Sequence, residues 1–183
     1  MTKYEELKHL FELANKEFLK NEKDMIERDI SERTLCGSLM KYLHEEKNKT
    51  VYKKYYVDVE YNRNCHESKK IKHSQGNIST INCDLIFHSR GNIKEKDNLI
   101  ALEMKKSNAR SEAKEKDKER LKSLTSDSYN GIWKQNKESL PKYVCGYELG
   151  IFYEIDIRRE KIFIEYYKNG QKVDSYILSL NEF

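Results

Sequence analysis

Proline, glycine and tryptophan are scarce in this sequence, with one, seven and one copies respectively among 183 residues. It contains no internal repeat and no low-complexity tract, which argues against a repeat architecture. No apolar run is long enough to span a bilayer, and none follows the charged N-terminus as it would in a signal peptide. We therefore expect a cytoplasmic protein without a membrane segment.

Paired cysteines are also missing. The four cysteines are far apart and form no CxxC motif, and Cys36, Cys83 and Cys145 lie among apolar neighbours. These three are expected to be reduced core residues. The phosphate-binding pattern GxxxxGK[ST] is absent as well, so ATP dependence within this chain is not expected.

The composition is that of a strongly charged globular protein. Charged residues make up 36% and hydrophobic residues 37%, but 13 tyrosines and 6 phenylalanines supply apolar area for a core. The net charge of +4 permits nucleic-acid binding without arguing for it. The length predicts one domain over 1–183, divided into N-terminal helices (1–48), a core (55–157) and a C-terminal hairpin (161–183).

Hydrophobic periodicity predicts an α/β sandwich in which helices flank a mixed β-sheet. The predicted order is ααβββαβββ, with a polar loop or hairpin tip over 62–77, and the Asn169–Gly170 pair indicates a hairpin between the last two strands. The predicted helices are 3–26, 29–46 and 107–125, and the predicted strands are 55–61, 82–88, 98–106, 143–157, 161–167 and 173–180.

Three charged residues interrupt two of the predicted strands. Glu103 and Lys105 follow the apolar run 99–102, and side chains two apart on a strand share a face. Asp84 lies in an apolar run on the preceding strand, which we expect to be its antiparallel neighbour. Carboxylates on adjacent strands could hold a magnesium ion for phosphodiester hydrolysis, and the Met104 carbonyl, between Glu103 and Lys105, could add a third oxygen. Alternatively, Glu103 and Lys105 form a structural salt bridge, and Asp84 is a strand-edge acid.

Residues 25–157 resemble the PD-(D/E)xK nuclease superfamily. The resemblance lies in Asp84, in the Glu103-x-Lys105 motif at the end of a hydrophobic strand, and in a preceding helix that carries a glutamate. The segments 57–63, 84–91 and 98–106 are similar to a branch of small bacterial and phage-borne proteins of this type. Cys83 replaces the proline that usually precedes the aspartate. The resemblance implies a restriction-endonuclease-like fold and a Mg²⁺- or Mn²⁺-dependent DNA endonuclease. It implies catalytic roles for Asp84, Glu103, Lys105 and a helix glutamate.

Glu32 is our choice for the helix glutamate, and Glu27 is the alternative. In this interpretation the metal ligands are Asp84, Glu103 and Glu32, and Lys105 orients the attacking water or stabilises charge on the phosphate. Glu32 also fits a capping box that starts at Asp29, which is a purely structural explanation.

Further polar residues at strand ends and in basic segments are candidates for nucleic-acid contacts. The basic candidates include segments 47–54 and 65–78 and the helix after Lys105, although charge runs are usually only solvated faces. His88 can equally be a polar residue at a strand end. The single candidate residues are Glu60, Asn62, Arg63, His88, Arg90 and Lys106.

A second class of function uses the same residues without catalysis. In this alternative the chain is a non-cleaving nucleic-acid-binding or regulatory module of a defence or mobile-element complex. The sequence does not distinguish RNA from DNA as the substrate. The aromatic C-terminal strands could form the face of a homodimer or merely a sheet edge.

Overall fold

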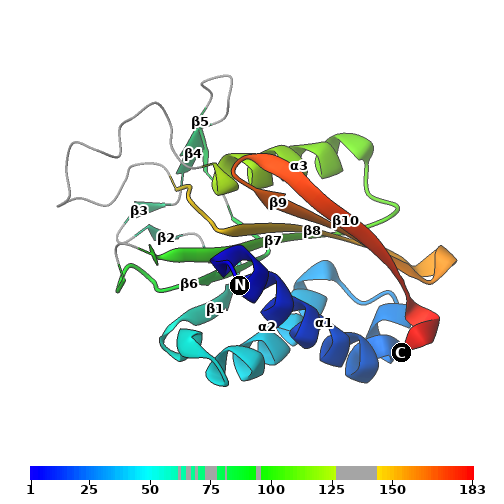
Figure 1. The fold of residues 1–183 in the computed structure, drawn as a ribbon. Coiled ribbons are helices and arrows are strands. Elements are labelled where there is room, and N and C mark those ends of the chain that lie inside the picture. Colours follow the sequence, from blue (N-terminus) through cyan, green and yellow to red (C-terminus); the bar gives the residue numbers. More distant parts are fainter. Residues whose placement is uncertain are drawn as a thin grey trace.

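The computed structural model describes residues 1–61, 82–93, 96–126 and 144–183, together with the backbone of four short strands between 63 and 80. The main elements form an α/β arrangement with helices on both sides of a six-stranded mixed sheet (Figure 1). They are α1 (Lys3–Glu27), α2 (Glu32–Asn48), β1 (Tyr56–Val59), β6 (Leu85–His88), β7 (Asn98–Lys106), α3 (Ser111–Thr125), β8 (Leu149–Asp156), β9 (Lys161–Lys168) and β10 (Gln171–Ser179).

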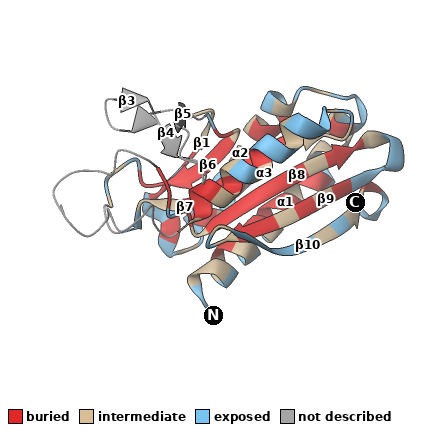
Figure 2. Cartoon of the chain, turned by 90° about the horizontal axis from the view of Figure 1, so that it is seen from above, coloured by how far each residue is buried: buried red, intermediate tan, exposed pale blue. Residues whose placement is uncertain are grey.

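The strands lie in the order β1-β6-β7-β8-β9-β10, so the predicted mixed sheet is confirmed. Only β7 and β8 pair in parallel, and the other neighbours in this sheet are antiparallel. A parallel pair needs a long crossover connection, which here contains α3. Figure 2 shows that the central strands are buried, whereas β10 is largely exposed at one edge.

The two faces of β7 pack against different helices. Ile100, Leu102 and Met104 belong to the larger core, which includes the apolar faces of α1 and α2. Ala101 belongs to a smaller core that includes Leu121 of α3. The alternation predicted from the sequence therefore continues through Glu103, whose side chain points to the α3 side and contacts that helix.

Local signals set the start of each N-terminal helix. α1 has a capping box in which Thr2 and Glu5 exchange side-chain and backbone hydrogen bonds. α2 starts at Glu32 and is capped by Ser31, whose hydroxyl accepts a hydrogen bond from the Thr34 N–H. The prediction of a capping box that starts at Asp29 is therefore wrong. Asp29 adopts a left-handed conformation with φ of 58° before the helix begins.

Other local predictions have mixed outcomes. Cys36, Cys83 and Cys145 are buried, as predicted. The β9–β10 hairpin is confirmed, with left-handed conformations at Asn169 and Gly170. Within and directly after the predicted loop or hairpin tip (62–77), the structure has four short strands: β2 (Arg63–Asn64), β3 (Glu67–Ser68), β4 (Lys70–Lys72) and β5 (Ile78–Thr80). None of the helices among the described residues has the length and apolar character needed to cross a membrane.

Gly150 provides a test of the packing between α3 and the sheet. An added Cβ would lie 2.9 Å from Thr125 Cγ2 and 3.0 Å from Tyr167 Cβ, both of which belong to packed elements. We expect Gly150→Ala to lower the free energy of unfolding by about 1–3 kcal/mol, because neither neighbour can move away cheaply. The measurement is urea unfolding followed by circular dichroism.

Gly37→Ala is the matched control, because an added Cβ at this position in α2 meets nothing within 4 Å. Alanine is the better helix former, so this variant should gain about 0.5–1 kcal/mol. Equal effects of the two substitutions would contradict the packing described here.

Candidate active site

Asp84 comes directly before β6 and is held against β7. Leu85 pairs with Leu102 in the antiparallel register, so Asp84 continues the pairing opposite Glu103. Asp84 Oδ2 accepts a hydrogen bond of 2.8 Å from the Met104 N–H. Burial raises the pKa of Asp84, and the nearby Lys105 ammonium only partly offsets this effect.

Glu103 is the most deeply buried acid of the site, with 1% of its surface exposed. Its Oε1 accepts a hydrogen bond of 2.7 Å from Arg120 Nη1. Its Oε2 is buried and has no hydrogen-bond partner among the described residues. Burial raises the pKa of Glu103 to about 8, in spite of the adjacent Arg120. Glu103 thus pairs with α3, and the predicted alternative of a salt bridge between Glu103 and Lys105 is not the arrangement seen.

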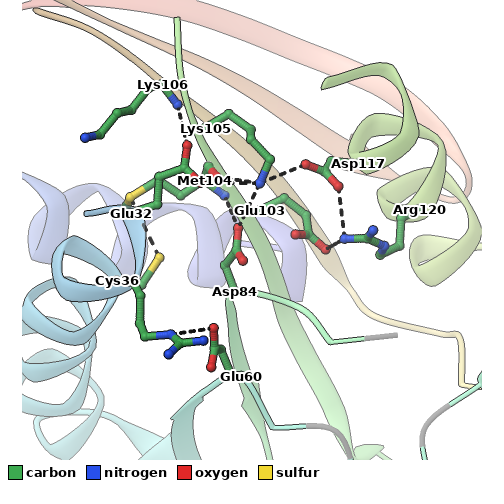
Figure 3. Close-up of polar contacts among 11 residues, drawn as sticks. Glu32, Cys36, Glu60, Asp84, Glu103, Met104, Lys105, Lys106, Asp117 and Arg120 are labelled. Carbon is green, nitrogen blue, oxygen red and sulfur yellow. Dashed lines mark hydrogen bonds and ion pairs between the residues drawn. The ribbon is translucent and has the colours of Figure 1, made fainter. Parts of the chain in front are cut away.

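The Lys105 ammonium lies among oxygens from several elements (Figure 3). Its Nζ is 3.0 Å from the Met104 carbonyl oxygen and 3.6 Å from both Glu32 Oε2 and Asp84 Oδ2. Burial lowers the pKa of Lys105, but Asp84 and Asp117 outweigh burial and raise it above its usual value. In this arrangement Lys105 is therefore a protonated cation.

Glu32, the first residue of α2, reaches the same cluster from the helical side. Its Oε1 accepts a hydrogen bond of 2.8 Å from the Lys106 N–H, and its Oε2 faces Lys105. The alternative, Glu27, is 54% exposed at the end of α1, where its only ion pair among the described residues is a 4.0 Å contact with Lys23. Glu32 therefore lies in the cluster around Lys105, whereas Glu27 has no contact with it among the described residues.

Sequence reasoning missed two residues of this cluster, Asp117 and Arg120 of α3. Asp117 Oδ2 lies 3.0 Å from Lys105 Nζ, an ion pair that does not meet hydrogen-bond geometry. Asp117 Oδ1 lies 3.0 Å from Arg120 Nη1, which also holds Glu103. A signal was present, because Asp117 precedes the buried Leu121 and Leu124 at helical spacing and so lies on the packed stripe.

A pocket of about 260 Å³ opens beside the cluster. Glu32 and Asp84 line it, so two of the predicted site acids face solvent-accessible space. The remaining lining residues come from the start of α2 and the end of β1, namely Ser31, Arg33, Val59 and Glu60.

His88 and Arg90, both predicted nucleic-acid contacts, form a separate cluster around Asp58. His88 is 1% exposed, and its Nε2 lies 2.9 Å from Asp58 Oδ2. Arg90 binds both oxygens of Asp58 and stacks over the Tyr56 ring. Burial alone would raise the pKa of Asp58, but these hydrogen bonds outweigh it and lower that pKa well below its usual value. His88 is thus buried, which agrees with the alternative that it is a polar residue at a strand end and not a nucleic-acid contact.

The other predicted nucleic-acid contacts have different positions. Glu60 lines the pocket and pairs with Arg33. Lys106 Nζ is bound to the Asp29 carbonyl and side chain. Lys47 is buried and donates to the Lys53 carbonyl, so it is a structural residue and not a phosphate contact. Asn62, the side chain of Arg63 and the side chains of segment 65–78 lie outside the described residues.

The residue types of the cluster fit a hard divalent cation. Carboxylates of Asp84, Glu103 and Glu32 and the Met104 carbonyl are all oxygen donors of the kind that Mg²⁺ and Mn²⁺ prefer. Glu103 Oε2 is a buried oxygen without a hydrogen-bond partner among the described residues. Within the described ranges, however, no three acids, histidines or cysteines already stand close enough to hold a metal. Cation binding would therefore require local adjustment, with Lys105 moving from among these oxygens.

Comparisons with protein-family models, with curated proteins and with solved structures returned no match for this chain.

The raised pKa of Glu103 predicts how the free energy of unfolding depends on pH. EDTA is present so that no metal ion is bound during the measurement. Between its usual value of 4.5 and about 8, folded Glu103 keeps a proton that unfolded Glu103 has released. Its contribution to the free energy of unfolding should therefore fall as the pH rises across this window, by at most about 1.4 kcal/mol per pH unit. Glu103→Gln stays neutral, so its stability relative to wild type should increase from pH 5 to pH 8.

Urea unfolding at several pH values measures this difference. Glu112→Gln, on the exposed side of α3, is the control and should show no comparable pH trend relative to wild type. A constant difference between Glu103→Gln and wild type from pH 5 to pH 8 would contradict a protonated, buried Glu103.

Proposed function

We propose that this protein is a metal-dependent nuclease with a restriction-endonuclease-like core, and that its substrate is DNA. The observation that carries the proposal is the convergence of Asp84, Glu32 and Asp117 on the Lys105 ammonium, next to buried Glu103. The pocket beside Asp84 and Glu32 supports it, because a substrate needs access to these acids. Grouped acids with perturbed pKa values in or near a pocket are typical of active sites.

Asp84, Glu103, Glu32 and the Met104 carbonyl are the proposed ligands of Mg²⁺ or Mn²⁺. When bound, the cation lowers the pKa of a water molecule and offsets the charge that develops on the phosphate. Glu103 would give up its proton for this role, and its Oε2 is the oxygen that Arg120 does not occupy. Asp84 and Glu32 are held in place by the backbone N–H groups of Met104 and Lys106.

Lys105 is proposed to stabilise negative charge and to orient the attacking water. Its raised pKa keeps it protonated near neutral pH, which suits a charge-stabilising role better than proton abstraction. In the arrangement described here its ammonium offsets the charges of Glu32 and Asp84. A bound cation would take over that task and free Lys105 for the phosphate.

Asp117 and Arg120 are proposed to be positioning residues. Asp117 holds the Lys105 ammonium from the α3 side, and Arg120 bridges Asp117 to Glu103. One helix thus orients both the lysine and the buried acid. Residues that orient metal ligands in this way commonly contribute 10- to 100-fold, as an order of magnitude, to affinity or activity.

A cleavage assay tests the proposal directly. Linear, circular and single-stranded DNA and RNA are incubated with Mg²⁺, Mn²⁺ or EDTA. We expect wild type to cut DNA only with a divalent cation. Asp84→Asn and Lys105→Met should lose about 10²–10⁴-fold in rate, because they remove a cation ligand and a charge-stabilising group. Lys20→Met, exposed on α1 and outside the candidate segments, should cut like wild type.

Cutting that persists in Asp84→Asn or Lys105→Met would remove the site assignment. If wild type cuts no substrate and binds no Mn²⁺ by calorimetry, the nuclease proposal fails. A non-cleaving nucleic-acid-binding module would then be the better description.

Asp117→Asn tests the positioning role on its own. We expect its cleavage rate to fall about 10- to 100-fold while calorimetric Mn²⁺ affinity stays close to that of wild type. Because Asp117 would act through Lys105, the double variant Lys105→Met/Asp117→Asn should lose no more than Lys105→Met alone. Glu115→Gln, 67% exposed on the same helix, is the control. Additive losses would contradict the role.

A further inference from the structure

Arg33 follows the predicted metal ligand Glu32 in the first turn of α2 and lines the same pocket. Its side chain is 73% exposed, yet it is tethered, because its Nε donates a hydrogen bond of 2.8 Å to Glu60 Oε1. This tether leaves the N–H groups on Nη1 and Nη2 for other acceptors. An oriented but accessible guanidinium is well suited to bind an anion.

Glu60 connects Arg33 to Asp84, the residue directly before β6. Its backbone N–H donates to the Asp84 carbonyl oxygen at 3.2 Å, and it follows β1, which pairs with β6. Glu60 has a left-handed backbone with φ of 52°, a conformation that non-glycine residues rarely adopt. Such conformations gather at functional sites. The Arg33–Glu60 pair therefore links Glu32 and Asp84 across the pocket.

The charges around the pocket indicate what Arg33 could bind. Among the described residues that line the pocket, three are acids, Glu32, Glu60 and Asp84, and Arg33 is the only cation. A phosphate that enters beside these acids is repelled unless cations face it. A divalent ion at Asp84 would supply one cation, and Arg33 would supply another.

We propose that Arg33 binds a backbone phosphate of the nucleic-acid strand next to the cleaved bond and that Glu60 positions it. This inference rests on the proposed nuclease function for its substrate class. Arg90, the other exposed arginine near β1, is a poorer candidate because Asp58 already takes its Nε and Nη2. Neither partner of the Arg33–Glu60 pair ligates the proposed cation.

Fluorescence anisotropy of a labelled DNA duplex tests the inference without relying on cleavage. Ca²⁺ replaces Mg²⁺, and gels verify that the duplex stays intact during the measurement. We expect Arg33→Gln to weaken binding about 5- to 10-fold and to reduce the slope of log K against log salt by about 0.9, the value of one phosphate contact. Glu60→Gln keeps an acceptor but removes a negative charge, so it should bind at least as tightly as wild type.

Arg28→Gln is the matched control, because Arg28 is 75% exposed, pairs with Asp24 and does not line the pocket. Thermal unfolding verifies that each variant is folded. If wild type cuts DNA but Arg33→Gln binds it like Arg28→Gln, the phosphate contact is overturned and the nuclease stands. A loss in Glu60→Gln as large as in Arg33→Gln would also overturn it, because the pair would then be merely structural.

The two proposals fail in different ways. If wild type binds DNA with the expected dependence on Arg33 but never cuts with Mg²⁺ or Mn²⁺, catalysis is wrong and the phosphate contact stands. If wild type neither binds nor cuts any nucleic acid, both proposals are overturned.

Discussion

The burial of Glu103 is the constraint on which the site depends. Leu99 to Leu102 anchor β7 in the core, so the next residue is carried into the interior with 1% exposure. An isolated carboxylate at that depth is costly to ionise, because water no longer solvates it. Arg120 offsets this cost from α3 on one face of the sheet. The position of that helix and the chemistry of the strand are therefore linked.

From Arg120 the charges alternate through the site. Arg120 contacts Glu103 and Asp117, Asp117 contacts Lys105, and Lys105 in turn faces Glu32 and Asp84. Removing one member leaves its neighbours buried without a counter-charge, so such networks are sensitive to single substitutions. In the proposed function a divalent ion would replace the lysine among the acids. The pocket beside Asp84 and Glu32 would give such an ion access.

Much of this arrangement could be predicted because it follows from strand periodicity. Asp84, Glu103 and Lys105 were placed together by alternation and antiparallel pairing, and the register confirms that Asp84 continues opposite Glu103. The start of α2 was misjudged, because a left-handed backbone at Asp29 depends on tertiary context and leaves no clear sequence signal. Arg120 was missed because a polar helix does not reveal which of its charges meets a partner distant in sequence. The sequence alone does not decide the role of His88, since its partner Asp58 lies on a different strand.

The central claim is that these acids hold a divalent cation. Anomalous scattering from a crystal soaked in Mn²⁺ tests it most directly. The account predicts a peak between Asp84 and Glu103, about 2.0–2.2 Å from their carboxylate oxygens, with Lys105 displaced from among the acids. An absence of any such peak, with Lys105 still between Asp84 and Asp117, would contradict the account.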